Sequence, residues 1–263
     1  AAYKCSWFSA VPTQFAYILN HPESAKDLSY LRFARSASAP LSPEIHRRFE
    51  ERFNIPIIET MGLTETGSQI TTNPLPPAIR KIGSPGTAFG NEIMIGDDTL
   101  AAVPAGTVGE ILVRGANVMQ GYLNQPEETA KTISPDGWLR TGDLGYLDQD
   151  GYVFVSGRIK ELIIKGGENI APREIDEALL EHEAVLEAAA FAVPCENYGE
   201  RVEACIRLKE QMQASASDLL AHCQTRLGKF KSPDTIHILE DLPKGPSGKV
   251  QRLKLFGLVY PAE

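Results

Sequence analysis

The chain has 263 residues, of which 43% are hydrophobic and 23% are charged. This length predicts one or two domains, and this composition excludes a disordered chain, a collagen-like chain and a coiled coil. The 26 basic and 34 acidic residues give a net charge of −8. An acidic chain is a poor nucleic-acid binder because phosphate contacts need clustered cations.

The sequence shows neither a membrane-spanning segment nor a cysteine pattern typical of a disulfide-bonded protein. No apolar run approaches the ~20 residues that cross a bilayer. None of the four cysteines has Cys-x-x-Cys or zinc-ligand spacing, so we expect free thiols and a cytoplasmic protein. The chain opens without Met or a signal-peptide pattern, which indicates a fragment of a longer protein.

The first predicted unit is a β-α-β arrangement. A helix is expected to start at Ser42-Pro43, with Ser42 as the cap and Pro43 in the first turn. Ile45, Phe49 and Phe53 recur every four residues, as one buried helix face requires. Strand-like segments at residues 31–35 and 56–60 flank the helix, which favours a parallel sheet.

A small antiparallel β subdomain is expected after Ile82, where glycine and proline become dense. A turn is expected at residues 148–151. The predicted strands lie at residues 92–95, 110–113 and 152–155.

From about Lys160 the pattern predicts an α+β domain with helices that start at Pro172 and near Ser217, the second ending at Gly228. The expected buried helix positions are Ile175, Ala178, Leu179, Leu220, Cys223 and Leu227, and the expected strands are residues 186–193 and 202–208.

Two candidate chemical segments lie before Lys160. In residues 59–67 a strand runs into a glycine-bearing turn, where Thr64 could donate to a phosphate oxygen and Glu65 could hold Mg²⁺. The alternative is an ordinary strand exit with capping side chains. In residues 138–143, Asp143 follows a glycine and could accept both hydroxyl groups of a ribose, or it could simply close an Asx turn.

Two further segments lie in the expected second domain. Gly166 and Gly167 could let an extended ligand lie against the backbone, or they could form a β-hairpin turn between solvated lysines. Lys249 lies on a loop rich in Gly, Pro and Ser and could place an ammonium group on a developing negative charge, or it could be a solvated turn residue. A P-loop is excluded because Pro243 and Val250 occupy positions where that motif needs Gly and Ser or Thr.

Other catalytic templates are absent from the sequence: there is no Gly-x-Ser-x-Gly, His-Glu-x-x-His or Gly-x-Gly-x-x-Gly motif. The five histidines are scattered, and we expect them on the surface; they are His21, His46, His182, His222 and His237.

Taken in order, these segments resemble the C-terminal half of the adenylate-forming (ANL) superfamily, which includes acyl-CoA synthetases, peptide-synthetase adenylation domains and luciferases. The resemblance covers essentially all 263 residues. It is carried by residues 11–13, 36–41, 61–65, 109–123, 138–143, 157–176, 227–233 and 243–252.

The resemblance implies an α/β plus α+β fold. Residues 1–159 would be the C-terminal part of the large AMP-binding domain, with a parallel α/β layer and a small β subdomain. Residues 160–263 would be the small mobile domain, which carries the catalytic lysine loop and rotates between the two half-reactions.

The implied activity is an ATP-dependent carboxylic acid–CoA ligase that uses ATP, Mg²⁺ and coenzyme A. The acid would first form an acyl-adenylate with release of pyrophosphate, and the thiol would then displace AMP. The alternatives are an adenylation domain that loads a carrier protein and a non-catalytic nucleotide-binding fragment. The family's phosphate loop would lie upstream of the first residue, so we expect the 263-residue chain to fold but to be inactive alone.

The resemblance also implies a role for each matching residue. Thr64 would contact the α-phosphate, Glu65 would hold Mg²⁺, Asp143 would bind the ribose and Arg158 the ribose or a phosphate. Lys249 would stabilise the adenylation transition state. The adenine would lie between Ser38, Ala39 and Pro40 on one side and Glu59, Thr60, Met61 and Gly62 on the other, Gly166 and Gly167 would contact CoA, and Lys160 would be the hinge.

Two finer expectations follow from the same resemblance. Residues 73–76 and 157–176 are similar to oxalate–CoA ligase-like proteins, which suggests a short or dicarboxylic acid. Residues 243–249 resemble the segment that lysine acetyltransferases modify in such synthetases, which suggests regulation at Lys249.

Overall fold

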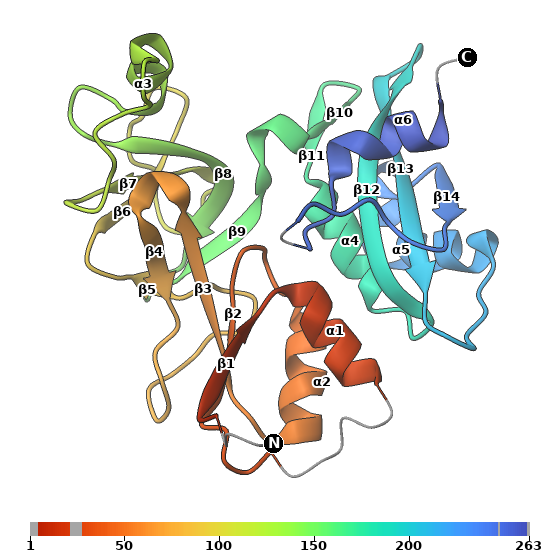
Figure 1. The fold of residues 1–263 in the computed structure, drawn as a ribbon. Helices are drawn as coiled ribbons and strands as arrows, with labels where there is room; N and C mark the ends of the chain where they lie inside the picture. The colour runs from red at the N-terminus through yellow and green to blue at the C-terminus, as the bar shows by residue number, and fades with distance from the viewer. Residues whose placement is uncertain (1–4, 22–27, 247, 262–263) are drawn as a thin grey trace. The chain divides into compact units, whose positions relative to one another are not determined.

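The computed structural model describes residues 5–21, 28–246 and 248–261 (Figure 1). The chain divides into two compact units, the first comprising Ala1–Phe15 with Pro22–Ile159 and the second Ala16–His21 with Lys160–Glu263. Its described strands form three sheets. No helix in the described parts of the chain has the length and apolar character needed to traverse a bilayer.

The first sheet has the order β1-β2-β3-β4-β5. Its strands β1 (Trp7–Ala10), β2 (Phe33–Ser36) and β3 (Ile57–Leu63) run parallel, as the β-α-β pattern predicts. Strands β4 (Ser68–Thr72) and β5 (Thr87–Ala88) then add in antiparallel pairing. Helix α1 (Pro12–Asn20) follows β1, and helix α2 (Pro43–Phe53) connects β2 to β3.

Helix α2 confirms the expected position but not the expected cap. Ser42 has an extended backbone at the N-cap, yet its side chain makes no capping hydrogen bond. The fixed φ of Pro43 in the first turn therefore sets the start of the helix. Phe49 is buried and packs edge-on against Phe15 at 5.1 Å, whereas Phe53 is only half-buried at the end of the helix.

The second sheet is an antiparallel four-stranded sheet of order β6-β7-β8-β9. Its strands are β6 (Glu92–Gly96), β7 (Gly109–Arg114), β8 (Leu139–Leu147) and β9 (Val153–Arg158), and α3 (Pro126–Thr132) precedes β8. Three of these strands and the turn at residues 148–151 confirm the predicted subdomain. Strand β8 was not predicted, because a glycine inside its sequence is typical of a turn. In the structure this residue, Gly142, has a φ of 71° within the strand.

The second unit contains one mixed sheet, β11-β10-β13-β12, with β14 on β13. The strands are β10 (Ile163–Lys165), β11 (Glu168–Ile170), β12 (Val185–Cys195), β13 (Gly199–Leu208) and β14 (Thr235–Ile238). Its helices are α4 (Pro172–Leu180), α5 (Ala216–Lys231) and α6 (Leu255–Val259). The short 3₁₀ turns η3 (Ile159–Glu161) and η4 (Arg252–Lys254) precede β10 and α6.

Helix α4 buries the three residues predicted for it, and α5 starts at Ala216, close to the predicted position. The Ser215 hydroxyl caps α5 by accepting a hydrogen bond from the Asp218 backbone N–H, so the helix starts before Ser217. Cys223 is buried as predicted, whereas Leu220 and Leu227 are only half-buried, and Leu219, which was not predicted, is buried instead. Gly228 breaks the helical backbone as expected, with φ of 72°, and one more turn follows it.

Candidate active site

The predicted adenine-binding segments meet at the carboxyl end of the parallel strands. Ser36, the last residue of β2, pairs in register with Glu59 of β3. Ser38, Ala39 and Pro40 follow β2 directly, and Ser38 has a left-handed φ of 79°. Ligands of open α/β sheets bind at this edge of the sheet. The register therefore brings the segments after β2 and at the end of β3, which are distant in the sequence, to an edge where a ligand can bind.

Glu59 is fixed from inside the protein. Its side chain is 5% exposed, and its Oε1 lies 2.9 Å from Nδ1 of His46 and accepts a 3.2 Å hydrogen bond from the Gly83 backbone N–H. The expectation that all histidines lie on the surface is therefore wrong for His46, which is 1% exposed on the inner side of α2. The sequence signal for this contact is the polar residue next to Ile45, inside an apolar helix face.

The segment that carries the predicted phosphate contacts is a tight turn. A Cβ on Gly62 would stand 2.1 Å from the carbonyl oxygen of Ser68, so only glycine lets β3 and β4 approach this closely. Thr64, Glu65 and Thr66 form the 3₁₀ turn η2. The hydroxyl of Thr66 donates to the Leu63 carbonyl and stabilises the turn, which leaves the exposed side chain of Thr64 outside the capping network.

Glu65 lies half-buried and is oriented by a residue that the sequence did not single out. The hydroxyl of Tyr122 donates to Oε1 of Glu65 at 2.9 Å, and the Met119 N–H donates to the Glu65 carbonyl at 2.8 Å. Burial and the neighbouring Glu65 carboxylate both raise the pKa of Tyr122, so its hydroxyl stays protonated as a donor.

The carboxylate of Glu65 fits a magnesium ion that is held chiefly by phosphate. Metal-binding carboxylates are commonly held by a second hydrogen bond, as Glu65 is by Tyr122. The described residues contain no group of three or more His, Cys, Asp or Glu side chains that could enclose a metal. Mg²⁺ commonly binds one or two carboxylates together with substrate phosphates, so one carboxylate is sufficient here.

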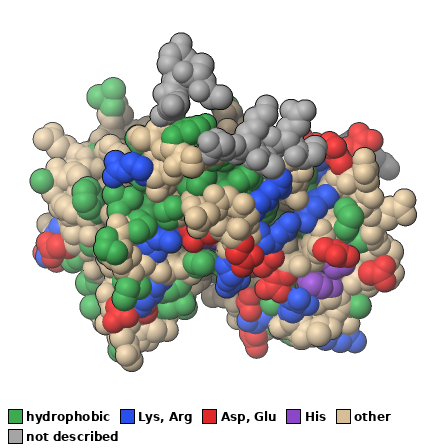
Figure 2. Space-filling model, turned by 90° about the horizontal axis from the view of Figure 1, so that it is seen from below, with side chains coloured by type: hydrophobic (Ala, Val, Ile, Leu, Met, Phe, Trp, Pro, Cys, Tyr) green, Lys and Arg blue, Asp and Glu red, His purple; other side chains and the backbone are tan. Residues whose placement is uncertain are grey.

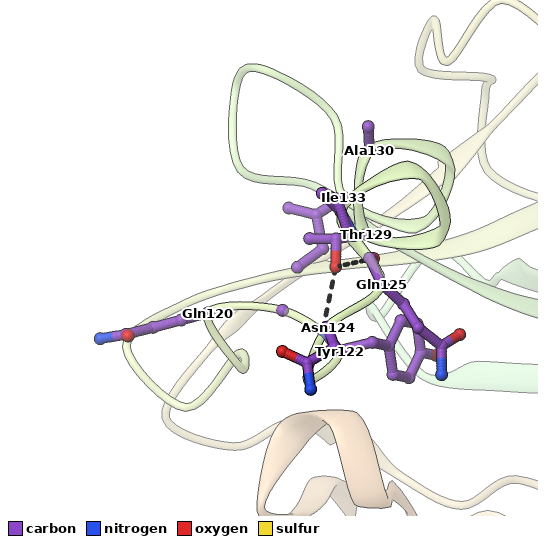
Figure 3. A pocket seen from close by; sticks show the side chains of 9 residues that line it. Gln120, Tyr122, Asn124, Gln125, Thr129, Ala130 and Ile133 are labelled. Atoms are coloured by element: carbon purple, nitrogen blue, oxygen red, sulfur yellow. Dashed lines mark hydrogen bonds between the residues drawn. The ribbon is translucent and has the colours of Figure 1, made fainter.

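An open pocket of about 480 Å³ lies beside Tyr122, next to α3 (Figure 3). Thr129 holds its wall by accepting from the Tyr122 N–H at 2.9 Å and donating to the Gln125 carbonyl at 2.9 Å. Gln120, Asn124 and Gln125 give its lining a polar character. The sequence analysis did not predict this pocket.

Asp143 and Arg158 form a short ion pair. They are opposite each other in the β8–β9 register, and the Arg158 Nε lies 2.7 Å from Asp143 Oδ1. Asp143 is 6% exposed, whereas the Arg158 side chain is 55% exposed. The structure thus brings together the two residues predicted to contact ribose and phosphate.

The turn before Asp143 is held by two residues with no predicted role. The Thr141 hydroxyl donates to the Ile111 carbonyl at 2.7 Å and accepts from the Asp143 N–H at 3.0 Å. Glu110 accepts from the Gly142 N–H at 2.9 Å and from Arg140 at 2.8 Å. Asp143 is therefore part of a strand, and its N–H is held by the Thr141 hydroxyl.

In the second unit, Gly166 and Gly167 form the turn of the β10–β11 hairpin. Their φ values of 60° and 85° are those of a two-residue turn that favours glycine at both positions. The neighbouring Lys165 is not solvated, as the hairpin alternative supposed, but only 5% exposed. Its Nζ lies 3.4 Å from Asp234 and 5.4 Å from the centre of the Phe230 ring.

Two exposed aromatic side chains flank this glycine turn. Tyr198 is 52% exposed and Phe230 is 41% exposed. A Cβ on Gly166 would lie 3.2 Å from the Tyr198 ring and 4.0 Å from the Phe230 ring, and the Gly166 N–H donates to the Tyr198 carbonyl at 2.8 Å. The sequence analysis missed both rings, which come from separate elements and have no shared spacing pattern.

The loop that carries Lys249 is anchored on both sides. The Gly245 N–H donates to the Lys249 carbonyl at 2.8 Å, and the Gln251 N–H donates to the Pro243 carbonyl at 2.7 Å. Lys244 pairs with Glu187 at 3.0 Å and also with Asp241. The side chain of Lys249 is exposed, and Ser247 lies outside the described residues.

Lys160 is an exposed residue of η3 and the first residue of the second unit after Ile159.

Across the face seen in Figure 2, Lys and Arg side chains are interspersed with Asp and Glu. The described cysteines carry no disulfide, and burial raises the pKa of both Cys205 and Cys223 to about 11.

Two family models match the chain. Residues 1–123 match the AMP-binding enzyme model, and residues 174–249 match the model of the AMP-binding enzyme C-terminal domain. A sulfoacetate–CoA ligase of Cupriavidus necator is 53% identical over 97% of this chain and 50% of its own length. An oxalate–CoA ligase of Arabidopsis thaliana is 42% identical over 95% of this chain and 49% of its own length.

Solved structures agree with these relatives. ATP-bound MatB from Rhodopseudomonas palustris superposes with a TM-score of 0.89 at 33% identity, over 97% of this chain and 52% of that one. The anthranilate–CoA ligase AuaEII in complex with anthranoyl-AMP gives a TM-score of 0.90 at 31% identity, over 97% and 50%. The chain thus spans about half the length of the relatives it matches.

Proposed function

Because the chain belongs to the adenylate-forming superfamily of AMP-binding enzymes, we propose that the full-length protein is an ATP-dependent carboxylic acid–CoA ligase. The predicted α/β plus α+β fold is confirmed by the likeness to solved members. The observation that carries the proposal is the register of Ser36 with Glu59, which brings Ser38–Pro40 and Glu59 to the carboxyl edge of β2 and β3, where open α/β sheets bind ligands.

In the first half-reaction, a carboxylate oxygen of the acid attacks the α-phosphorus of ATP, and the bond to pyrophosphate breaks. Thr64 donates its exposed hydroxyl to the α-phosphate, and Asp143 accepts hydrogen bonds from the two ribose hydroxyls. Arg158, already 2.7 Å from Asp143, contacts the ribose or a phosphate. Lys249 places its ammonium group on the charge that develops in this transition state.

Mg²⁺ bound at Glu65 would neutralise part of the phosphate charge. The hydrogen bond from the Tyr122 hydroxyl orients the Glu65 carboxylate for this role. Adenine lies between Ser38, Ala39 and Pro40 on one side and Glu59, Thr60, Met61 and Gly62 on the other.

In the second half-reaction, the CoA thiolate attacks the acyl carbonyl carbon and AMP leaves with the bonding electrons. Gly166 and Gly167 let the extended thiol substrate lie against the hairpin, since neither presents a side chain. The exposed rings of Tyr198 and Phe230 offer apolar faces beside that turn. Lys160 is the hinge about which the second domain, residues 160–263, turns relative to residues 1–159 between the steps.

The acid is proposed to be short and to carry a second anionic group. The relatives named sulfoacetate–CoA ligase and oxalate–CoA ligase support this class of substrate. Pyrophosphate release by the full-length protein, assayed with a panel of mono- and dicarboxylates and sulfonated acids, tests it. A preference for long unbranched fatty acids would overturn the substrate class.

The thiol acceptor separates this proposal from its alternatives. A CoA ligase makes acyl-CoA from free CoA, whereas a carrier-loading enzyme transfers the acyl group only to a phosphopantetheinylated protein. A full-length protein that binds ATP but releases no pyrophosphate with any acid would favour the non-catalytic nucleotide-binding alternative.

We also propose a cytoplasmic location and control by acetylation of Lys249. The buried free thiols suit a reducing compartment, and the Lys249 side chain is exposed to a modifying enzyme. Acetylation removes the charge that the first half-reaction uses. Mass spectrometry of the protein from its native cells would detect the modification, and fractionation of those cells would locate the protein.

A further inference from the structure

The first unit contains a buried histidine that the reaction scheme above does not use. His46 on α2 lies between two carboxylates: its Nδ1 is 2.9 Å from Oε1 of Glu59, and its Nε2 is 3.0 Å from Oε1 of Glu50. The histidine is 1% exposed, so water cannot replace either partner.

The geometry determines the protonation state of this ring. A neutral imidazole has one N–H donor and one acceptor nitrogen, while an ionised carboxylate only accepts hydrogen bonds. Both ring nitrogens face carboxylate oxygens, so with both carboxylates ionised the two contacts are hydrogen bonds only if the ring is an imidazolium.

The charges around the ring balance in that state. Glu50 also accepts from Arg80 Nη1 at 2.5 Å and from the Ile57 N–H at 2.6 Å. Among the described residues, the charged groups that contact His46 are Glu50 of α2 and Glu59 of β3, and Arg80 of the segment after β4 contacts Glu50. Two carboxylates and one guanidinium leave one negative charge, which the imidazolium cancels.

We propose that His46, as an imidazolium, is a positioning residue of the nucleotide site that holds the Glu59 carboxylate and with it the adenine-facing segment Glu59 to Gly62. The inference rests on the proposed function, because Glu59 matters to nucleotide binding only if adenine lies beside it. Glu59 has two described side-chain restraints, His46 from α2 and the Gly83 N–H from the loop after β4. Loss of the proton leaves the ring one N–H for two carboxylates and removes the positive charge beside Glu59, so the first restraint is weakened.

This arrangement makes the nucleotide site sensitive to alkaline pH. Burial lowers the pKa of His46, but the hydrogen bonds and charges of Glu50 and Glu59 outweigh burial, and the pKa is raised above its usual value. The ring therefore holds its proton to a higher pH than an ordinary histidine does, and its hold on Glu59 weakens when that proton is lost.

The first test measures the protonation state of the His46 ring in the 263-residue chain. Long-range ¹H–¹⁵N correlation spectra should show both nitrogens of His46 protonated at pH 7, with a titration midpoint above that of an ordinary histidine. The spectrum of the His46→Gln variant identifies the resonance. The midpoint should fall in Glu59→Gln, which removes one charge. A single protonated nitrogen at pH 7 would overturn the imidazolium assignment.

The second test measures the Michaelis constant for ATP of the full-length enzyme. His46→Gln should raise the Michaelis constant for ATP about tenfold, the lower end for a lost charge-assisted hydrogen bond, and leave kcat and the constant for the acid nearly unchanged. The Michaelis constant for ATP of the wild type should rise at alkaline pH, and this rise should be absent in the variant. His222→Gln is the matched control, because His222 bonds only the Ala178 carbonyl and an arginine of its own helix among its described partners.

The double variant separates positioning from a general structural role. If His46 acts through Glu59, then His46→Gln combined with Glu59→Gln should raise the Michaelis constant no further than the larger single effect. Additive effects, or an unchanged Michaelis constant in folded His46→Gln, would overturn the positioning role. If His46→Gln does not fold, two measurements still test the positioning role. They are the change in the His46 titration midpoint in Glu59→Gln and the pH dependence of the wild-type Michaelis constant for ATP. A wild-type protein that forms no acyl-adenylate would instead refute the proposed function.

Discussion

Arg252 connects the end of the Lys249 loop to the first turn of the second unit through Glu161. Its Nε lies 3.0 Å from Oε2 of Glu161, and its Nη2 lies 2.7 Å from Oδ2 of Asp176. The same guanidinium also donates to the Ala190 carbonyl. These contacts join η3, α4 and β12, so Arg252 holds the position from which the Lys249 loop departs.

Replacement of Arg252 by Ala should destabilise the second unit by about 3 kcal/mol, because two largely buried carboxylates lose their partner. Arg226→Ala is the control: Arg226 pairs with Glu181 at the surface, and its loss should cost less than about 1 kcal/mol. Urea unfolding followed by circular dichroism measures both values. Equal effects would show that the Arg252 contacts are no stronger than a surface pair.

Lys249→Ala in the full-length enzyme should slow adenylation by about 10²–10³ and spare thioester formation from preformed acyl-adenylate. The reason is that, in the proposed reaction, the ammonium group would meet developing charge only in the first transition state. Single-turnover kinetics of each half-reaction measure the difference, with the exposed Lys254→Ala as the control. Equal losses in both half-reactions would contradict this role.

Asp143→Ala should raise the Michaelis constant for ATP at least tenfold and leave that for the acid nearly unchanged. Two hydrogen bonds from ribose hydroxyls to a carboxylate would be lost, each worth about 1.5–3 kcal/mol. Asp98→Asn, an exposed acidic position in the same β subdomain, is the control. If calorimetry shows unaltered ATP binding by the Asp143 variant, the residue serves only the β8–β9 pairing.

Lys160→Pro should stop the catalytic cycle without unfolding either unit. Proline fixes φ and removes an N–H, so it should hold one of the two domain arrangements. One half-reaction should then survive and the other should be lost, while Lys160→Ala retains both. A folded proline variant with both rates at the wild-type level would place the hinge elsewhere, for example at Gly157.

Acid should destabilise the first unit through Glu50. Burial raises the pKa of this carboxyl, but hydrogen bonds from His46, Arg80 and the Ile57 N–H outweigh burial and lower the pKa from 4.5 to about 2. The carboxylate thus stabilises the fold above pH 4.5, and this contribution, of the order of 3 kcal/mol, is lost as the pH falls towards 2. Unfolding measured between pH 7 and 3 should show a smaller decline in Glu50→Gln than in the exposed control Glu51→Gln.

The local pattern alone determined the elements with strong periodicity and distinctive ends. Helix α2 follows from Pro43 and the spacing of Ile45 and Phe49, and the break in α5 follows from Gly228. The candidate residues Thr64, Asp143 and Lys249 follow from the order of short motifs that the family shares. Such signals act within a few residues, so they can be read without knowing what packs against them.

The tertiary structure alone decided which side chains meet. The pairing of Asp143 with Arg158 depends on the register of β8 with β9, and β8 itself was not predicted. The positions of His46 against Glu59, Tyr122 against Glu65 and Arg252 against Glu161 join residues from 13 to 91 positions apart. Hydrogen bonds and ion pairs require atoms within about 3 Å, and only the folded packing of separate elements sets such distances.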